Sequence, residues 1–282
     1  MTPPIVWVDG QLVGVAEARV SPLDHGLMVG DGVFETLRVY GGVPFAWTRH
    51  YDRLRRSATG LGLIPPAGDE LRGAADAVLG ANRLRDARLR ITLTGGPAPL
   101  GSERGETGPT VIVAAAAMRP WPPSVSVVQV PWTRNERSAV AGLKTISYAE
   151  NVRALAFALE HGASEAVFTN TRGELCEATG SNVFVVRDGT ARTPPEDAGC
   201  LLGVTRALVL ELCSKTLAIP TEETALPPLA LSEADEAFLT SSTREIHPIS
   251  HVDGAALPPT PGPTTSALAS AFSELVARDP DP

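Results

Sequence analysis

The sequence predicts a two-domain α/β protein of the α+β-like kind, in which helices flank mixed or antiparallel sheets. Short strand-like runs are separated by glycine turns such as Asp9-Gly10 and Gly41-Gly42. Helical patterns stand between groups of strands, and the proline-rich stretch Met118–Ser124 interrupts the chain. We therefore expect a smaller N-terminal α/β domain over residues 1–118, a linker over 119–124 and a larger C-terminal domain over 125–282.

The first half reads as antiparallel strands with two helices. The expected strands are Ile5–Val8, Val33–Tyr40, Val43–Trp47, Arg88–Thr94 and Thr110–Ala116. The first helix has apolar residues at Tyr51, Leu54, Ala58 and Leu61, with Thr48 as its expected N-cap. A second helix is expected over Asp69–Leu79.

The second half adds strands and three longer helices. The expected strands are Val125–Val130, Glu165–Thr169, Leu175–Thr179, Asn182–Arg187 and Glu236–Ser242. One helix carries Val152, Leu155, Ala156 and Leu159 at helical spacing, with Ser147 and Glu150 as an expected capping box and Gly162 at its end. The others begin near Gly203 and cover Ser266–Arg278.

Composition argues against several classes of function. The 24 basic and 32 acidic residues give a net charge of -8, the wrong sign for a nucleic-acid surface. We expect no membrane partner and a cytoplasmic protein, because the start lacks a signal pattern and no apolar run reaches about 18 residues. The cysteines have no C-x-x-C spacing and the histidines no ligand spacing, so no metal site is expected.

Lys144 is the first candidate for chemistry. The chain contains only two lysines, Lys144 and Lys215, and uses arginine for its other basic residues. A lysine amine becomes neutral and attacks a carbonyl, which arginine does not do. Lys144 precedes an expected helix start by three residues, where positive potential disfavours the ammonium form. The alternative is a loop lysine that reaches solvent.

Three segments offer anion sites. In "GVTR", Gly203 allows close backbone approach, and the amides of Val204 and Thr205 open an amphipathic helix. The segment "LTSSTRE" crowds hydroxyls, including Ser242 and Thr243, after a strand. Arg53 lies beside the apolar stripe of its helix, where its fork suits an oxyanion. The alternatives are an ordinary helix cap, a polar strand end and a surface ion pair.

Glu177 stands inside an expected strand, where a carboxylate is costly without a partner. A protonated ring nitrogen is one such partner. The nearby small residues, Ser181 among them, and the Asn182 side chain allow a flat ring to approach. The alternative is an edge-strand glutamate that faces water.

Taken together, these segments resemble the class IV aminotransferases. The resemblance rests on Lys144 with its following helix, "CEATGSNVF", "GVTR", "GDGVFETLRVY" with "RHYDRL", and "FLTSSTREIHPI", and it spans nearly the whole chain. This family comprises pyridoxal-phosphate enzymes of fold type IV: branched-chain aminotransferases, D-amino-acid aminotransferases and 4-amino-4-deoxychorismate lyases. The resemblance implies their two-domain fold, a homodimer and a small-molecule substrate.

The resemblance also implies a role for each candidate. Lys144 would bind pyridoxal phosphate covalently and then move the proton, and Glu177 would keep the ring nitrogen protonated. Arg53, Val204, Thr205, Ser242 and Thr243 would hold the phosphate, with Gly203, Ser181 and Asn182 also lining the cofactor site. Phe34, Thr36 and Arg38, on one face of a strand, would line the substrate side.

Within the family, "SPLDHGLMVGDGVFETLRVY" and "LKTISYAEN" look most like bacterial 4-amino-4-deoxychorismate lyases, which release pyruvate and leave 4-aminobenzoate. "TSSTREIHPI" looks equally like the aminotransferases, so an aminotransferase of branched-chain or other small amino acids is the alternative. D-amino-acid aminotransferases place a carboxylate-binding arginine where this chain has Gly95, with Arg90 or Arg104 as substitutes. A non-catalytic binding protein on the same scaffold is disfavoured because Lys144 and Glu177 are both present.

Overall fold

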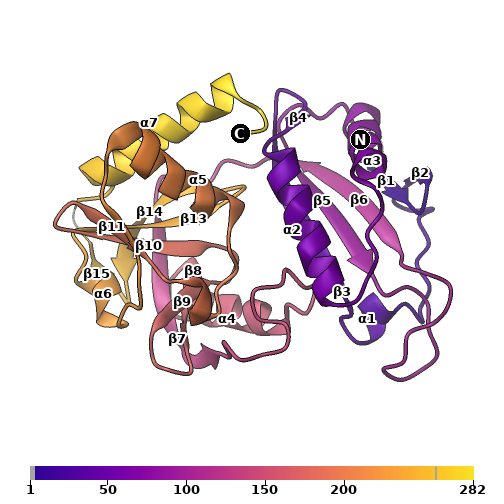
Figure 1. Ribbon diagram of the computed structural model, residues 1–282, viewed down its shortest axis with the longest axis horizontal. Coiled ribbons are helices and arrows are strands. Elements are labelled where there is room, and N and C mark those ends of the chain that lie inside the picture. The colour runs from indigo at the N-terminus through magenta and orange to yellow at the C-terminus, as the bar shows by residue number, and fades with distance from the viewer. Residues whose placement is uncertain (1–3, 258) are drawn as a thin grey trace. The chain divides into compact units, whose positions relative to one another are not determined.

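The computed structural model describes residues 4–257 and 259–282, which form two compact units. Unit 1 comprises the chain up to Arg119 together with Leu143–Ser147 and Pro280–Pro282. Unit 2 comprises Pro120–Gly142 and Tyr148–Asp279. Figure 1 shows the elements of each unit. Among the described residues, no helix is long and apolar enough to cross a membrane.

Unit 1 is an antiparallel sheet with helices packed on it (Figure 1). The strand order is β2-β1-β6-β5-β3-β4, from β1 (Ile5–Val8), β2 (Gln11–Gly14), β3 (Gly32–Tyr40), β4 (Val43–Pro44), β5 (Ala87–Thr94) and β6 (Val111–Ala117). The helices are α1 (His25–Met28), α2 (Trp47–Gly60) and α3 (Gly68–Ala81). Alternate residues of β3, such as Val33 and Leu37, bury against Leu54 of α2 and form the core.

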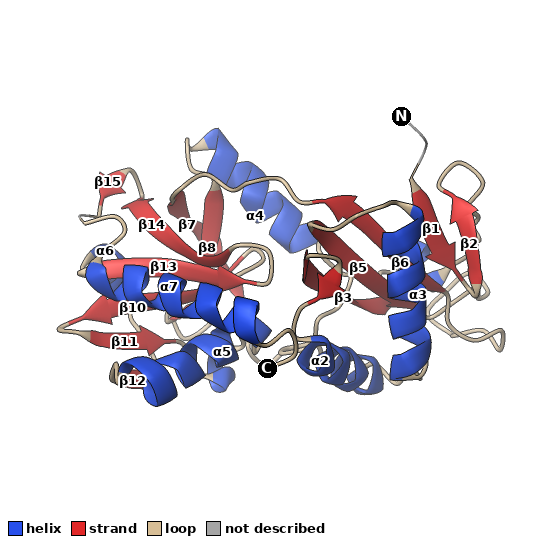
Figure 2. Ribbon diagram, turned by 90° about the horizontal axis from the view of Figure 1, so that it is seen from above, coloured by secondary structure: helices blue, strands red, loops and turns tan. Residues whose placement is uncertain are grey.

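Unit 2 is a larger mixed sheet (Figure 2). Its strands are β7 (Val125–Arg134), β8 (Glu165–Asn170), β9 (Leu175–Ala178), β10 (Asn182–Arg187), β11 (Thr190–Thr193), β12 (Thr221–Glu223), β13 (Glu236–Ser241), β14 (Glu245–Val252) and β15 (Ala255–Ala256). The order is β12-β11-β10-β13-β14-β7-β8-β9, and β15 pairs with β14. The mixture of parallel and antiparallel pairs agrees with the predicted fold class.

The helices of unit 2 lie on this sheet. They are α4 (Ala149–Glu160), α5 (Val204–Leu212, continued by a π-turn over Cys213–Leu217), α6 (Leu229–Ser232) and α7 (Pro263–Arg278), with a short 3-10 turn over Glu196–Ala198. The first, α4, packs against β7 and β8, whereas α5 and α7 contact each other and β13. Buried aliphatic side chains from the sheet, such as Val183 and Leu239, form the core.

The segment Leu143–Ser147 belongs to unit 1, although its position in the sequence suggested the C-terminal domain. Thr145 forms an isolated antiparallel bridge with Val33. The Phe34 N–H donates to the Lys144 carbonyl at 3.0 Å, and the Ile146 N–H donates to the Gly32 carbonyl at 2.9 Å. These backbone bonds fix the lysine segment to the start of β3.

The predicted start of the first helix was wrong. The strand predicted over Val43–Trp47 ends at Pro44, and α2 begins at Trp47 with Ala46, not Thr48, as N-cap. Thr48 instead binds the Asp281 carboxylate through its N–H and its hydroxyl, at 2.9 and 2.6 Å. Proximity to the C-terminal residues of the same unit therefore replaces the local cap.

The predicted capping box before α4 was wrong as well. Tyr148 is the N-cap and makes no side-chain cap bond. The Ser147 hydroxyl donates to the Gly30 carbonyl at 2.9 Å, and the Glu150 carboxylate accepts from Arg134 Nη1 at 2.5 Å. Both box residues are used by partners far away in the sequence.

Candidate functional site

The predicted site residues divide between the two units. Phe34, Thr36, Arg38, Arg53 and Lys144 belong to unit 1. Unit 2 contains the rest: Glu177, Ser181, Asn182, Gly203, Val204, Thr205, Ser242 and Thr243. In unit 1 the predicted residues other than Arg53 lie on the Phe34 side of β3, and Arg53 lies on the opposite side.

Lys144 is held in an extended segment beside β3. Its backbone N–H donates to the Ser57 hydroxyl at 3.1 Å, and its Nζ lies 4.4 Å from the centroid of the Phe34 ring. The helix α4 begins at Ala149, later in the sequence than predicted. Within unit 1, the amine contacts the aromatic face of Phe34.

The predicted substrate residues share one face of β3. Phe34, Thr36 and Arg38 alternate with the core residues of the strand. Arg90 of β5 pairs directly with Thr36 in the antiparallel register, so its side chain emerges on the same face. Its guanidinium carbon lies 3.7 Å from the centroid of the Phe34 ring, which thus contacts both the Lys144 amine and the Arg90 cation.

Arg38 also faces this side of the sheet. Its Nη2 lies 3.4 Å from the Asp86 carboxylate, and its guanidinium packs over Tyr40 at 4.8 Å. Its Nη1 is buried and has no hydrogen-bond partner among the described residues. A buried donor without a partner is costly, so this atom is a reasonable contact for an anionic oxygen of a ligand.

Arg53 lies on the other side of β3, in a buried triad with Glu35 and His50. Its Nε and Nη2 each donate to the Glu35 carboxylate at 2.7 Å, and His50 Nδ1 lies 2.7 Å from the same carboxylate. Burial alone raises the pKa of Glu35, but Arg53 and His50 outweigh it and hold that pKa far below its usual range. Burial lowers the pKa of His50 despite the adjacent Glu35. The carboxylate therefore fixes the arginine fork in one orientation.

Gly95 is packed against a carboxylate. A Cβ built at Gly95 would lie 2.3 Å from Asp31 Oδ2. Arg104 binds both oxygens of Asp31 at 2.7 Å, and this contact lowers the pKa of the carboxyl. Arg104 also donates to the Gly62 carbonyl at 3.2 Å. The pairing with Asp31 engages Arg104, so of the two substitutes considered from the sequence only Arg90 lies beside the substrate face.

Glu177 lies in β9 of unit 2 as predicted, half-buried. Its Oε2 accepts from the Leu201 N–H at 3.0 Å, and its Oε1 lies 3.7 Å from Arg134 Nε. Arg134 itself packs over Phe168 and binds Glu150. A backbone donor and a guanidinium thus flank the two oxygens of this carboxyl group.

The remaining cofactor candidates gather at one end of β10 and β13. These strands are antiparallel, with Asn182 opposite Thr240, so the start of β10 lies beside the turn that carries Ser242 and Thr243. Asn182 Nδ2 donates to the Leu201 carbonyl at 2.7 Å, and a Cβ at Gly203 would lie 2.1 Å from Asn182 Oδ1. Close packing therefore brings the start of α5 to the same end of the sheet.

This end of unit 2 fits a phosphate-bearing ring cofactor. Gly203 is the N-cap of α5, and the Val204 and Thr205 amides open the helix, where backbone donors favour an anion. The hydroxyls of Ser181 and Thr240 are buried and lack a hydrogen-bond partner in the part of the chain that the structure describes. Donors without acceptors, beside a helix N-terminus, match the needs of a phosphate.

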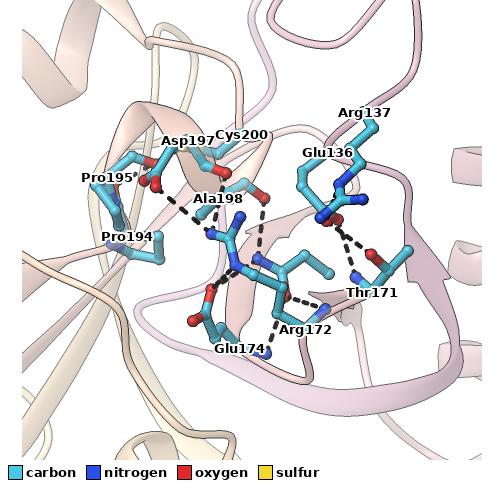
Figure 3. A network of polar contacts seen from close by, with 11 residues as sticks. Glu136, Arg137, Thr171, Arg172, Glu174, Pro194, Pro195, Asp197, Ala198 and Cys200 are labelled. Carbon is cyan, nitrogen blue, oxygen red and sulfur yellow. Dashed lines mark hydrogen bonds and ion pairs between the residues drawn. The ribbon is translucent and has the colours of Figure 1, made fainter.

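A polar network fixes the loops that lead to these residues (Figure 3). The Glu136 carboxylate accepts from the Thr171 hydroxyl at 2.7 Å and from the Thr171 N–H at 3.0 Å, and these bonds lower the pKa of Glu136 to about 2. Arg172 binds Glu174 at 2.8 Å and the Asp197 carbonyl at 3.0 Å. The network joins the loop before Lys144 to the β8–β9 turn and the 3-10 turn that precedes α5.

Thiol and metal chemistry find no support among the described residues. Cys176, Cys200 and Cys213 are buried and free, and burial raises the pKa of Cys200 to about 12. No group of three or more histidine, cysteine or acidic side chains in residues 4–257 and 259–282 is arranged to hold a metal ion.

Sequence reasoning missed Arg134 near Glu177 and did not decide between Arg90 and Arg104. Arg134 ends β7, far from Glu177 in the sequence, so only the parallel pairing of β7 with β8 brings it close. The antiparallel pairing of β3 with β5 puts Arg90 opposite Thr36, although β4, α2 and α3 separate the two strands in the sequence. The register, which sequence alone left open, was the missing information.

Comparisons with known proteins agree with these observations. A family model described as amino-transferase class IV matches residues 32–252. A provisionally assigned branched-chain-amino-acid aminotransferase of Methanocaldococcus jannaschii is 35% identical over 254 residues, 88% of each chain. The D-alanine aminotransferase of Listeria innocua is 32% identical, over 97% of this chain and 96% of its own.

Solved structures give the same result. The branched-chain aminotransferase of Thermoproteus uzoniensis with norvaline superposes with a TM-score of 0.91 at 32% identity, covering 97% of this chain and 94% of the other. A provisionally assigned 4-amino-4-deoxychorismate lyase of Legionella pneumophila reaches 0.87 at 25% identity, covering 92% and 96%. The predicted fold is confirmed by these matches.

Proposed function

This chain belongs to the class IV aminotransferases, and we propose that within the family it moves amino groups between small apolar amino acids and 2-oxo acids. The enzymes of this family depend on pyridoxal 5′-phosphate, whose ring withdraws electrons from the bound substrate. The observation that carries the proposal is the pairing of an amine, Lys144, with a cation, Arg90, on the same Phe34 ring.

Each residue has a proposed task. The Lys144 amine holds the cofactor and moves the proton at the substrate Cα. Glu177, which accepts from the Leu201 amide and lies 3.7 Å from Arg134 Nε, is proposed to stabilise a proton on the ring nitrogen. The phosphate is proposed to bind Arg53, the Val204 and Thr205 amides with the Thr205 hydroxyl, and the Ser242–Thr243 turn, while Ser181, Asn182 and Gly203 line the ring and phosphate sites.

The substrate class follows from the face of β3. Phe34 places a buried apolar ring between Lys144 and Arg90, and apolar surroundings favour an aliphatic substrate side chain. Arg90 offers a fork for a carboxylate, and Arg38 offers a buried donor on the same face. The similarity to branched-chain aminotransferases supports the same class.

D-amino acids are the weaker choice despite the similarity to D-alanine aminotransferases. An arginine at position 95 would have to displace the Asp31 carboxylate, because Asp31 Oδ2 would lie 2.3 Å from its Cβ. Arg104 does not replace it, since both oxygens of Asp31 engage its guanidinium. The carboxylate-binding arginine attributed to those enzymes is therefore missing at position 95.

A 4-amino-4-deoxychorismate lyase is the second candidate. The stretches "SPLDHGLMVGDGVFETLRVY" and "LKTISYAEN" favour it, as does the similarity to the Legionella pneumophila protein. Both reactions use the same amine and the same ring, so the residues above do not distinguish them.

We also propose that the enzyme is a homodimer. The stripe on α4 that sequence patterning suggested as apolar lies mostly at the surface, with Val152 66% and Leu159 64% exposed, whereas Ala154 and Ala158 face the core. Contiguous apolar side chains exposed on a helix mark an interaction surface. A second copy covering α4 would bury them.

Two experiments test the proposal. Purified protein treated with pyridoxal phosphate should turn yellow, and borohydride reduction should leave the pyridoxyl group on the peptide that contains Lys144. Lys144→Ala should abolish labelling and turnover and keep the circular dichroism spectrum. Lys215→Ala is the matched control, because Lys215, the other lysine of the chain, is exposed and forms an ion pair with Glu211 on the same helical surface. A colourless preparation, or unchanged activity of Lys144→Ala, contradicts the assignment.

The second experiment separates the reactions. Aminodeoxychorismate is supplied in one assay, and L-branched-chain amino acids or D-alanine with 2-oxoglutarate in others. Glutamate formed from the L-amino acids supports the proposed aminotransferase. Release of pyruvate from aminodeoxychorismate without amino-group transfer identifies the lyase.

A further inference from the structure

Arg244 is the centre of a buried polar network in unit 2. It follows Ser242 and Thr243 in the turn between β13 and β14. Its Nη2 donates to Glu165 Oε2 at 3.0 Å, its Nη1 lies 3.0 Å from His247 Nδ1, and its guanidinium stacks on Trp121 at 3.9 Å from the ring centroid. The side chains of Arg244 and Glu165 are only 9% and 4% exposed. The arginine therefore joins three segments that are distant in the sequence.

The two ends of the network touch proposed cofactor residues. Glu165 Oε1 accepts from both the N–H and the hydroxyl of Thr179, which lies between Glu177 and Ser181. The Trp121 Nε1–H donates to the Thr243 carbonyl at 2.8 Å. Arg244 thus connects the segment beside the proposed ring site with the turn proposed to hold the phosphate.

The tautomer of His247 follows from its two partners. Nε2 lies 2.8 Å from the Pro122 carbonyl, which can only accept, so Nε2 carries the hydrogen. Nδ1 then presents its lone pair to an N–H of Arg244. Burial lowers the pKa of His247, and the Arg244 charge lowers it further, although the Pro122 carbonyl opposes them. The neutral ring is therefore the form that fits.

The groups around His247 disfavour a second proton on its ring, which would bind at Nδ1. Its neighbour on β13 is Leu239, and the segment before β7 contributes the Pro122 carbonyl and the Trp121 ring. Arg244 is the adjacent charge, with Glu165 of β8 beyond it. Protonation would put an Nδ1–H against an Arg244 N–H at 3.0 Å, so two donors and two positive charges would face each other.

We infer that Arg244 is a positioning residue that sets Thr179 and the Ser242–Thr243 turn for cofactor binding, and that protonation of His247 releases it. The inference rests on the proposed function, because it assigns this network to the same cofactor site. Arg244 itself touches no reacting atom in this scheme. Its effect is on the affinity of the protein for pyridoxal phosphate.

The test is an equilibrium titration of apoprotein with pyridoxal phosphate between pH 5.5 and 8, followed by absorbance. Results are expressed as the ratio of each variant's Kd to that of the wild type, so that protonation of the cofactor itself cancels. Arg244→Met should weaken binding by about tenfold or more at pH 8, since it leaves buried polar groups without partners. Its ratio should fall as the pH is lowered toward 5.5, because protonation of His247 weakens binding by the wild type.

His247→Asn keeps an acceptor near the Nδ1 position and does not titrate. It should bind as the wild type does at pH 8 and more tightly than the wild type at pH 5.5. His251→Asn, on the exposed part of the same strand, is the matched control and should follow the wild type throughout. His247→Gln serves as a second variant if His247→Asn does not fold.

NMR of ¹⁵N-histidine apoprotein gives a reading that needs no variant and no cofactor. It should show His247 as the Nε2–H tautomer at pH 8. An Nδ1–H tautomer, a wild-type affinity for Arg244→Met at pH 8, or a pH-independent ratio for His247→Asn would each overturn the inference. Absence of any pyridoxal phosphate binding by the wild type at pH 8 would instead overturn the proposed function.

Discussion

Replacing Glu35 by glutamine should destabilise unit 1 strongly. The Glu35 side chain is fully buried and accepts from Arg53 Nε, Arg53 Nη2 and His50 Nδ1, each at 2.7 Å. Glutamine keeps the size of the side chain but removes the charge, which leaves the Arg53 cation buried without its counter-ion. Breaking a buried ion pair in this way costs about 3–5 kcal/mol, or a factor of roughly 10² to 10⁴ in the folding equilibrium.

The loss should depend on pH with a definite sign. The folded-state pKa of Glu35 lies far below the ordinary value of 4.5, so the carboxylate contributes its full stabilisation above that value. As the pH falls below 4.5, Glu35 becomes protonated in the unfolded chain but stays ionised in the folded chain, so its contribution to the free energy of unfolding declines. The free-energy difference between wild type and Glu35→Gln is therefore largest near neutrality and narrows in acid.

The assay is urea denaturation of the apoprotein at pH 7 and pH 4, followed by tryptophan fluorescence in a protein in which Trp121 and Trp132 of unit 2 are replaced by phenylalanine, so that Trp7 and Trp47 of unit 1 give the signal. Asp76→Asn is the control, because it breaks the exposed Arg72–Asp76 pair at 3.2 Å and should change stability by less than about 1 kcal/mol. A Glu35→Gln effect as small as that of the control at pH 7, or one that is unchanged at pH 4, would refute the reasoning.

Two further predictions concern Gly203 in the proposed cofactor site and the exposed side of α4 in the proposed dimer. Gly203→Ala should weaken pyridoxal phosphate binding by about tenfold or more in an absorbance titration, because its Cβ would lie 2.1 Å from Asn182 Oδ1. Gly73→Ala, in the open middle of α3, should bind as the wild type does, and equal loss in both variants would remove the steric explanation. Val152→Glu combined with Leu159→Glu should halve the mass seen by sedimentation velocity, since both side chains are exposed on α4. An unchanged dimer, or a monomeric wild type, would contradict the assigned interface.

The strands could be predicted from sequence because their signals are local. Glycine turns at Asp9-Gly10 and Gly41-Gly42 and the alternation in Gly32–Tyr40 depend on neighbouring residues only. The elements that were missed are short or lack such signals, for example β11 (Thr190–Thr193) and β12 (Thr221–Glu223), which pair in parallel with each other. Parallel partners are set by the tertiary fold and leave little local trace.

Helix ends were harder because capping residues have competing partners. Ser147 and Glu150 have the spacing of a capping box, but Gly30 and Arg134 bind their side chains. Thr48 likewise binds Asp281 rather than the helix start. In each case one tertiary hydrogen bond outweighs a cap that contributes about 1 kcal/mol.

The prediction for α4 was wrong about which side of the helix is buried. Apolar residues at helical spacing indicate one face, but not whether that face meets the core of the same chain. Here alanines at 154 and 158 allow α4 to approach β7 and β8, and the larger side chains at 152 and 159 point outward. Size, rather than hydropathy, decided which stripe faces the sheet.

The candidate site was found through motifs, whereas the residues that support it were not. Arg244 and Glu165 are 79 positions apart, and His247 lies 125 positions from Pro122. No sequence pattern near these residues predicts such pairs. The one local sign is the histidine in "IHPI", because a buried strand seldom contains histidine between apolar residues. Charged groups buried away from the proposed chemistry need partners, and searching for those partners is what reveals the network.

Gly95 illustrates why substrate assignment needs the structure as well as the motif. From sequence, a missing arginine at this position leaves the carboxylate partner open. In the structure, Asp31 occupies the space and Arg104 neutralises it, so an arginine at position 95 would have to displace an existing ion pair. A cation for the substrate must then come from elsewhere on the sheet, and the β3–β5 register brings Arg90 next to Thr36 and Phe34. The antiparallel pairing of these segments therefore places Asp31 beside Gly95 and also places Arg90 beside the Phe34 ring, which contacts the Lys144 amine.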